Sequence, residues 1–322
     1  IPSQATSLKA PSSDGWGFFV FGCYSLVSII RWRLGAESGV TKTWLLKMLL
    51  PPDHIVEDLR KAFENAPYLS NKHESYFETY AKLLAPYRGK SITFVEVGIV
   101  SGGSLFMWRE FLGPKARIIG VEFNPDAVRW REAGFEIFIG SQSDPEFWKS
   151  FFEAVGCVDV LLDDGGHTYE QQISTVHHAL PWVKDQGLIL VEDTHTSYFK
   201  AFGYPSAFTF IEWVKVLIDN INSRCEQVAV SSLSYSKIVH SVEIFESIVA
   251  FKVDKRICVG SKSISNGRES VDPEDFRFKD FESKIWWLPA SLRATKFGRR
   301  LANSLAKRAH RRNLRRLKGF FE

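Results

Sequence analysis

Alternating strand-like and helical segments between residues 92 and 192 constrain the fold of this chain more than any other feature. The strand-like segments are short and rich in Val, Ile, Leu and Phe, and they lie at residues 92–98, 116–123, 135–140, 158–163 and 187–192. Helical patterns separate them, at residues 103–112, 125–133, 144–155 and 168–183. This alternation is typical of crossover units that build a parallel sheet.

Segments on either side extend the pattern. Amphipathic helices are predicted within residues 53–67 and 70–90, and a longer helix follows Phe208. Strand-like runs near residues 236–245 and 247–253 predict an antiparallel pair. We therefore expect an α/β fold with a mostly parallel, doubly wound sheet and a late antiparallel strand.

A glycine-rich turn joins the first predicted strand to the helix that follows it. Gly98, Gly102 and Gly103 allow positive φ and close approach of a ligand, and the helix start offers free N–H groups. The spacing G-x-x-x-G-G differs from the G-x-G-x-x-G of dinucleotide binders. Glu96 suits a cofactor with an amino group and a sulfonium, so we predict S-adenosylmethionine. The alternative is a tight turn with no ligand.

The ends of the next two strands carry polar residues. Glu122 ends the second strand, where an acid can accept hydrogen bonds from ribose hydroxyls. Ser141 and Gln142 follow the third strand and are expected to face the crevice, near an adenine edge. Asp144 and Pro145 are also expected to cap and begin the next helix.

Pairs of acidic residues end the fourth and fifth strands. These pairs are Asp163-Asp164 and Glu192-Asp193. Carboxylates that meet at adjacent strand ends repel one another unless a cation or protons offset them. Oxygen ligands favour a hard cation such as Mg²⁺, or Mn²⁺. We predict Asp164, Glu192 and Asp193 as its ligands, with Asp163 directed either toward the cofactor or behind these ligands.

Two histidines flank the acidic pairs, His167 and His195. A neutral imidazole can act as general base on a hydroxyl, and His195 is the first candidate. A metal that binds the same hydroxyl would lower the pKa of that hydroxyl.

The chain resembles class I S-adenosylmethionine-dependent O-methyltransferases of the macrolide-sugar and rhamnosyl type, which are related to cephalosporin hydroxylase-like proteins. The motifs that carry the resemblance lie within residues 68–255 and are SNKHESYFETYAKLLAPYRGK, FVEVGIVSGGSLFMW, IIGVEFNP, GSQSDPEF, LLDDGGHTYEQQ and LILVEDTHTSYF. The resemblance implies a Rossmann-like sheet, a divalent metal, and methyl transfer to a hydroxyl of a sugar, glycoside or related natural product.

The resemblance also implies roles for single residues. It places the metal ligands on Asp164, Glu192 and Asp193, and Lys72 and Tyr76 in a segment that lids the cofactor. With these two, the predicted cofactor-binding residues are Glu96, Gly98, Gly102, Gly103, Ser104, Glu122, Ser141, Gln142 and Asp163.

This chain departs from the family pattern at two site positions. Ser141 replaces an acid of the pattern GDQSD, which puts adenine recognition in doubt. Glu243 stands where some members carry a catalytic histidine, so the base is left open among His195, Glu243 and His240. The alternatives to the methyltransferase are a hydroxylase-like or nucleotide-binding oxidoreductase, and a catalytically inactive scaffold that binds S-adenosylmethionine.

The two ends of the chain differ from its centre. Residues 291–322 contain eleven Lys or Arg and one acidic residue, although the whole chain has a net charge of only +4. This tail predicts a basic amphipathic helix on an anionic membrane, a nucleic-acid contact, or a solvated tail. The apolar run Gly15–Ile30 is short for a membrane-spanning helix, which needs about 20 residues.

We expect three parts: an apolar, helical extension at residues 1–67, the methyltransferase domain at 68–258, and a polar linker with a basic segment at 259–322. Four widely spaced cysteines indicate reduced thiols rather than a zinc site. We expect a cytoplasmic protein, peripheral to a membrane through its tail, that forms a homo-oligomer and acts on a sugar- or polyketide-type hydroxyl. Nucleic acid is not an expected partner.

Overall fold

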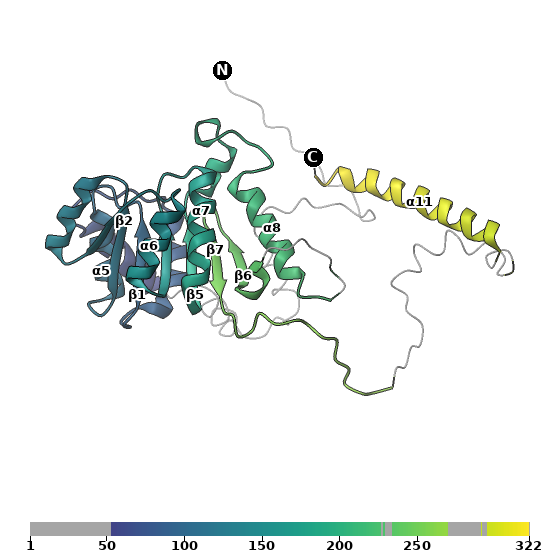
Figure 1. Cartoon of the computed structure of the whole chain (residues 1–322), viewed down its shortest axis with the longest axis horizontal. Coiled ribbons are helices and arrows are strands. Elements are labelled where there is room, and N and C mark those ends of the chain that lie inside the picture. The colour runs from purple at the N-terminus through teal and green to yellow at the C-terminus, as the bar shows by residue number, and fades with distance from the viewer. Residues whose placement is uncertain (1–52, 227, 229–233, 270–290, 292–294, 322) are drawn as a thin grey trace, which may run out of the picture. The chain divides into compact units, whose positions relative to one another are not determined.

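The computed structural model describes residues 53–226, 228, 234–269, 291 and 295–321 (Figure 1). The apolar run Gly15–Ile30, predicted as a packed or membrane-surface helix, lies outside the described residues. The chain divides into two compact units, Ile1–Ser261 and Lys262–Glu322. Each unit is considered separately below.

The first unit is built on a seven-stranded sheet with the order β3-β2-β1-β4-β5-β7-β6. Its strands are β1 (Thr93–Val97), β2 (Arg117–Glu122), β3 (Glu136–Ile139), β4 (Val158–Asp163), β5 (Val183–Val191), β6 (Val239–Ile244) and β7 (Val249–Val253). Strands β1 to β5 are parallel, and β7 runs antiparallel to both β5 and β6. The predicted α/β fold class is therefore confirmed.

The register of the sheet determines which strand ends meet. Val97 pairs with Asp163, and Asp163 pairs with Val191, so β1, β4 and β5 end at one level. The chain order reverses between β1 and β4, since β2 and β3 lie on one side and β5 on the other. In open α/β sheets, ligands bind at the carboxyl ends of the strands beside such a reversal.

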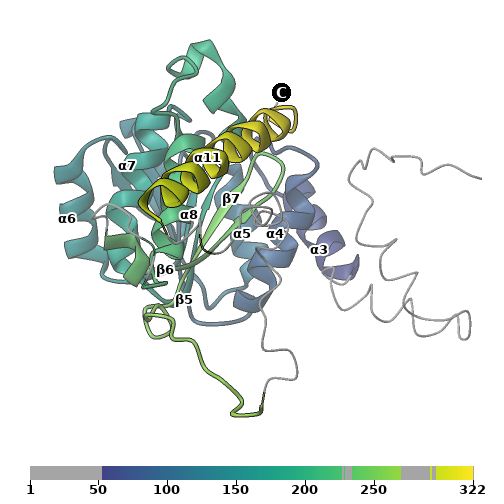
Figure 2. The same cartoon turned by 90° about the vertical axis from the view of Figure 1, so that its right-hand side faces the viewer.

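Helices cover both faces of the sheet (Figure 2). One face carries α3 (Asp53–Glu64), α4 (Tyr76–Leu84) and α5 (Gly103–Leu112), and its core includes the fully buried Phe94 and Trp108. The other face carries α6 (Pro145–Val155), α7 (Tyr169–Ala179) and α8 (Phe210–Asn222), and its core includes Trp148 and Phe152. Two apolar cores on a shared sheet explain why β4, VDVLLD, is a near-continuous apolar run.

Local signals explain where several helices start and stop. Asp144 accepts a hydrogen bond from the N–H of Glu146 and Pro145 begins α6, as predicted. Thr168 and Gln171 form a capping box at the start of α7. That helix ends four residues before the predicted limit, at Ala179, because Pro181 cannot continue it.

Several 3₁₀ elements also lie among the described residues of the first unit. The segment Pro125–Ala133, predicted as an ordinary helix, is a 3₁₀ helix (η2). The other 3₁₀ elements are η1 (Ala85–Tyr87), η3 (Leu180–Trp182), η4 (Thr194–Tyr198), η5 (Lys200–Phe202) and η6 (Ser234–Lys237). Strand β5 begins at Val183, four residues earlier than predicted.

The second unit contains one long helix among its described residues, α11 (Lys296–Lys318). Thr295 caps its start by accepting a hydrogen bond from the N–H of Gly298. The predicted basic helix is therefore present. Among the residues that the structure describes, no helix is long and apolar enough to cross a membrane.

Candidate functional site

The glycine turn after β1 lies directly against the loop after β4. Gly98 has a φ of 83°, and a Cβ at this position would come within 2.2 Å of the carbonyl oxygen of Asp164. The N–H of Asp164 donates to the carbonyl of Val97 at 2.9 Å. The predicted need for glycine here thus arises from both a left-handed backbone and a close approach between two loops.

A cavity of about 350 Å³ opens beside this crossing. Four of the predicted cofactor residues line it: Gly98, Glu122, Ser141 and Gln142. Gly165 and Gly166 line it as well and were not predicted to do so. Their position directly after Asp164, at a strand end, is the signal that would have found them.

The other glycines of the turn have a packing role. A Cβ on Gly102 would come within 2.4 Å of the Trp130 ring, and one on Gly103 would come within 2.2 Å of the Tyr68 carbonyl oxygen. Neither glycine lines the cavity. They allow the segment before α4 and the 3₁₀ helix η2 to pack against the start of α5.

Glu122 holds the backbone around the cavity. One oxygen accepts from the N–H groups of Ile99 and Val100 at 3.0 and 2.9 Å, and the other accepts from Phe123 and Asn124 at 2.8 and 3.0 Å. Four donors match the acceptor capacity of one carboxylate. A ribose hydroxyl at Glu122 would have to share or replace one of these hydrogen bonds.

Gln142 lines the inner wall of the cavity, and Asp163 supports it from behind. The Gln142 amide donates to Asp163 at 3.1 Å and to the Thr175 hydroxyl at 3.1 Å, and its oxygen accepts from the N–H of Gly166 at 2.8 Å. Burial raises the pKa of Asp163 to about 6, although hydrogen bonds from Gly165 and Gln142 oppose the shift. These residues therefore fix the shape of the wall, with Asp163 behind Gln142.

Glu96 faces away from the cavity. Its carboxylate is fully buried and accepts from the Ser104 hydroxyl at 2.8 Å and from the Trp108 indole at 3.0 Å. Burial raises the pKa of Glu96 to about 7. Glu96 and Ser104 were predicted to contact a cofactor. In the structure their hydrogen bond joins β1 to α5.

The predicted metal ligands meet at the ends of β4 and β5, and an ammonium group lies among them. Lys72 donates to Asp164 at 2.5 Å and to Glu192 at 3.0 Å, and its side chain is 1% exposed. Burial lowers the pKa of Lys72, but the charges of Asp164 and Glu192 outweigh it and raise that pKa overall. Lys72 was predicted as part of a cofactor lid, and the structure places it on the carboxylates instead.

Asp193 lies on the other side of the cluster. It has a left-handed backbone, with a φ of 53°, and accepts from the Tyr76 hydroxyl at 2.5 Å. Nε2 of His167 lies 3.4 Å from its carboxylate and Nε2 of His73 lies 3.8 Å away. Tyr76 thus contacts a predicted metal ligand rather than the cavity, and His73 was missed although it follows Lys72 in the same motif.

The donor set in the described residues fits a hard divalent cation. Ligand atoms of Asp164, His167 and Asp193 lie within 4.8 Å of one another, as do those of His73, Asp193 and His195. Within the described part of the chain, Nδ1 of His167 is buried without a hydrogen-bond partner. Glu192 belongs to neither group, and Lys72 contacts both of its oxygens.

The candidate bases occupy very different surroundings. Nδ1 of His195 lies 2.9 Å from the Ser247 hydroxyl, in the turn between β6 and β7. Glu243 pairs with Lys82 at 3.0 Å and with Lys252, and despite burial these contacts lower its pKa. Glu243 is therefore unsuited to the role of base that the sequence left open. His240 lines a different cavity, at the amino ends of the strands.

Comparison with known proteins identifies related sequences and structures. Residues 95–194, from β1 to just beyond β5, match the family model of a methyltransferase domain. The chain is 30% identical over 212 residues to 8-demethyl-8-alpha-L-rhamnosyl tetracenomycin-C 2'-O-methyltransferase of Streptomyces olivaceus, covering 61% of this chain and 54% of that protein. It is 31% identical over 156 residues to L-olivosyl-oleandolide 3-O-methyltransferase of Streptomyces antibioticus, covering 44% and 40%.

A solved structure shares the fold. The MycE methyltransferase of the mycinamycin biosynthetic pathway, solved with Mg, S-adenosylhomocysteine (SAH) and mycinamycin VI, superposes with a TM-score of 0.57 at 23% identity. The match covers 68% of this chain and 57% of that one. The chain thus spans about half the length of the relatives it matches, or less. Its residues 95–194 match the model of a methyltransferase domain, and the chain is similar to O-methyltransferases of rhamnosyl and olivosyl compounds.

Proposed function

We propose that this protein is an S-adenosylmethionine-dependent, divalent-metal-assisted O-methyltransferase that acts on a hydroxyl of a sugar or glycoside. One observation carries the proposal. The loop from Asp164 to Thr168 lines the cavity through Gly165 and Gly166, and it supplies Asp164 and His167 to the carboxylate cluster. A cofactor in the cavity and an acceptor at the cluster would therefore be neighbours. The named activities of the relatives support the acceptor class.

The cavity walls suit a bound nucleoside. Phe123 is 75% exposed and Val100 74% exposed at the cavity rim, where both could pack against a ring. Glu122 could accept from a hydroxyl that shares or replaces one of its four backbone donors, and Ser141 offers a hydroxyl in place of the family's acid. Glu96, on the far side of the turn, would act indirectly by fixing the helix start.

Asp164 and Asp193, with His167 beside them, would hold the divalent cation, and Glu192 would join them if Lys72 withdrew. A bound divalent cation lowers the pKa of an acceptor hydroxyl and orients it. Asp193 is well suited to such a role because Tyr76 fixes one of its oxygens. Holding an acceptor oxygen in line with the methyl group lowers the barrier, because the two reactants no longer need to find this geometry by diffusion.

His195 is the residue we propose as base. When its Nδ1–H donates to Ser247, its Nε2 is left free to take the proton from the acceptor hydroxyl. The ring also lies near Asp193, so base and metal ligands would face the same hydroxyl.

Titration calorimetry with SAH, with and without Mg²⁺, tests the proposal, together with mass spectrometry of rhamnosides incubated with S-adenosylmethionine. We expect binding, and a product heavier by one methylene only when Mg²⁺ is present. Absence of SAH binding would exclude the methyltransferase. Binding without any methylated product or metal effect would favour an inactive scaffold.

The second unit supports a separate proposal, that α11 lies on an anionic membrane surface. The segment from Lys296 to Lys318 contains ten Lys or Arg and no acid, and Phe320 and Phe321 beyond it are 85% and 88% exposed. Basic residues beside exposed aromatics suit the interface of an anionic bilayer. Co-sedimentation with phosphatidylserine vesicles should require residues 295–322. Equal recovery of the full chain and a chain ending at residue 290 in the supernatant would contradict this.

A further inference from the structure

Lys72 is the one described lysine whose side chain is both 1% exposed and paired with two carboxylates of the candidate site. It lies 92 residues before Asp164 and 120 before Glu192, so only the tertiary fold brings them together. Lysine is almost never fully buried unless it is paired. The ammonium thus occupies this position because the carboxylates need a cation there.

Its contacts overlap with those expected of a metal. The ammonium lies 2.5 Å from an oxygen of Asp164 and about equally far, 3.1 and 3.0 Å, from both oxygens of Glu192. These two residues are two of the three predicted metal ligands. The third, Asp193, contacts Tyr76 and His167 instead. A cation that used all three carboxylates would take the place of the ammonium.

The backbone around Lys72 is anchored on both sides. Before it, the Tyr68 ring packs on Trp130 at 4.6 Å between ring centres, and the Tyr68 carbonyl lies against the start of α5. After it, Tyr76 donates to Asp193. The long, flexible side chain of Lys72 can therefore leave the carboxylates while both anchors stay in place.

We propose that the Lys72 ammonium occupies part of the divalent-cation site and competes with the metal for Asp164 and Glu192. In the metal-free protein it offsets the charge of the buried Glu192. When a divalent cation enters, the ammonium withdraws and Glu192 becomes a ligand. This inference rests on the metal site of the proposed function.

The test compares Lys72→Met with the wild-type full chain, without cofactor. Mn²⁺ affinity is measured from the electron paramagnetic resonance signal of free Mn²⁺, and thermal unfolding is followed with and without Mn²⁺. We expect Lys72→Met to unfold at a lower temperature without metal, because Glu192 loses its partner, and to bind Mn²⁺ at least about tenfold more tightly. Mn²⁺ should then raise its unfolding temperature more than that of the wild type.

Two further variants control for charge and location. Lys72→Arg keeps the charge and should keep the wild-type Mn²⁺ affinity within about threefold. Lys82→Met removes a lysine that pairs with Glu243, away from the cluster, and should leave the affinity unchanged. If Lys72→Met does not fold, Lys72→Gln is measured in its place, since its amide can still donate to Asp164.

Unchanged or weaker Mn²⁺ binding in the neutral variant would overturn the inference and place Lys72 beside the metal rather than in its position. Absence of Mn²⁺ binding in both wild type and variant would also overturn it. Calorimetry with SAH on the same samples separates this result from failure of the proposed function, because intact SAH binding would leave the cofactor site standing.

Discussion

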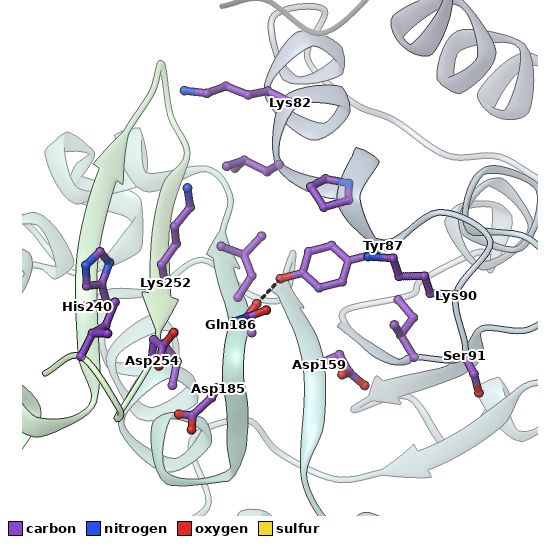
Figure 3. A pocket seen from close by; sticks show the side chains of 17 residues that line it. Lys82, Tyr87, Lys90, Ser91, Asp159, Asp185, Gln186, His240, Lys252 and Asp254 are labelled. Carbon is purple, nitrogen blue, oxygen red and sulfur yellow. Dashed lines mark hydrogen bonds between the residues drawn. The ribbon is translucent and has the colours of Figure 1, made fainter.

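Cavities of opposite character lie at the amino ends and at the carboxyl ends of the parallel strands. The cavity at the amino ends of the strands is the larger, about 580 Å³ against about 350 Å³ at the carboxyl ends. Figure 3 shows the larger one, where the Tyr87 hydroxyl donates to the Gln186 carbonyl at 2.8 Å. Its acids pair near the surface: Asp159 with Lys184 at 2.7 Å, and Asp254 with Arg256 at 2.6 Å.

At the carboxyl ends of the strands the charges are crowded and largely withdrawn from solvent. Asp164 and Glu192 share one ammonium, from Lys72, Asp193 lies beside them, and the backbone is left-handed at His167 and Asp193. Strained backbone and incompletely compensated charge cluster at functional sites. Cavity size alone would favour a functional site at the amino ends of the strands. Strand order and the crowding of charges favour the carboxyl ends instead.

The largest expected effect is on turnover, and it comes from Asp164→Asn at the carboxyl ends of the strands. Removing a carboxylate that would hold the metal should lower the turnover of methyl transfer about a thousandfold. SAH affinity, measured by calorimetry, should change less than about threefold, because Asp164 faces the cluster. Asp185→Asn, in the cavity at the amino ends of the strands, is the control, and its turnover should stay within about twofold of the wild type. Equal losses of turnover in the two variants would contradict the assignment of the active site to the carboxyl ends of the strands.

Glu96 adds a pH dependence that belongs to the carboxyl half of the sheet. Burial raises its pKa from 4.5 to about 7, so between these values the folded protein binds the proton more tightly than the unfolded chain. Stability from this group is therefore lost as pH rises through that window, by about 3 kcal/mol in all. Between pH 4.5 and 7.5, the free energy of unfolding measured in urea should therefore fall less steeply for Glu96→Gln than for the wild type.

The surface acid Glu136 serves as the opposite control for Glu96. A hydrogen bond from Arg117 lowers the pKa of Glu136, so its contribution is present at neutral pH and lost in acid. Glu136→Gln should therefore shift the pH slope slightly in the other direction. A Glu96→Gln slope identical to that of the wild type would show that Glu96 is ionised without cost.

The choice of base predicts a third contrast. His195→Asn should lower the kcat of methyl transfer about a hundredfold with little change in KM for the cofactor. Glu243→Gln should lower it less than about threefold, because Glu243 is already neutralised by Lys82 and Lys252. Steady-state kinetics by mass spectrometry measures both. A larger loss in Glu243→Gln would restore Glu243 as the base.

The smallest expected contrast compares two glycines that have the same φ. Gly98 and Gly134 both have a φ of 83°, but a Cβ would meet Asp164 at 2.2 Å on Gly98 and nothing within 4 Å on Gly134. Gly134→Ala should cost only the left-handed penalty of about 1 kcal/mol, and Gly98→Ala about 2 kcal/mol more. Denaturant unfolding measures both. If both variants lost the same free energy of unfolding, the loop after β4 would have to move away from the new Cβ without loss of stability.

Much of the fold follows from local sequence, because apolar runs and capping signals act over a few residues. Pro145 and Asp144 mark the start of α6, and the runs in β4 and β5 mark buried strands. The 3₁₀ geometry of Pro125–Ala133 was missed, since its helical pattern resembles that of an α-helix.

The site was predictable where strand ends determine it and unpredictable where side-chain direction does. Asp164 and Asp193 meet because β4 and β5 are neighbours in the sheet. Glu96 could have faced either loop or helix, and only packing against Ser104 and Trp108 decides between them. The position of Lys72 depends on a fold-back across 92 residues, which no local pattern encodes.

The placement of β7 has a consequence for synthesis of the chain. Strand β5 is covered on its outer edge only by β7, which pairs along Gly187–Val191. A ribosome that has made residues up to about 248 has therefore released a nearly complete parallel sheet with a bare apolar edge. Such edges recruit other chains, and partly made sheets aggregate readily. Truncations that remove Val249–Val253 should accordingly accumulate as insoluble protein, whereas truncation after Ser261 retains all seven strands of the described sheet.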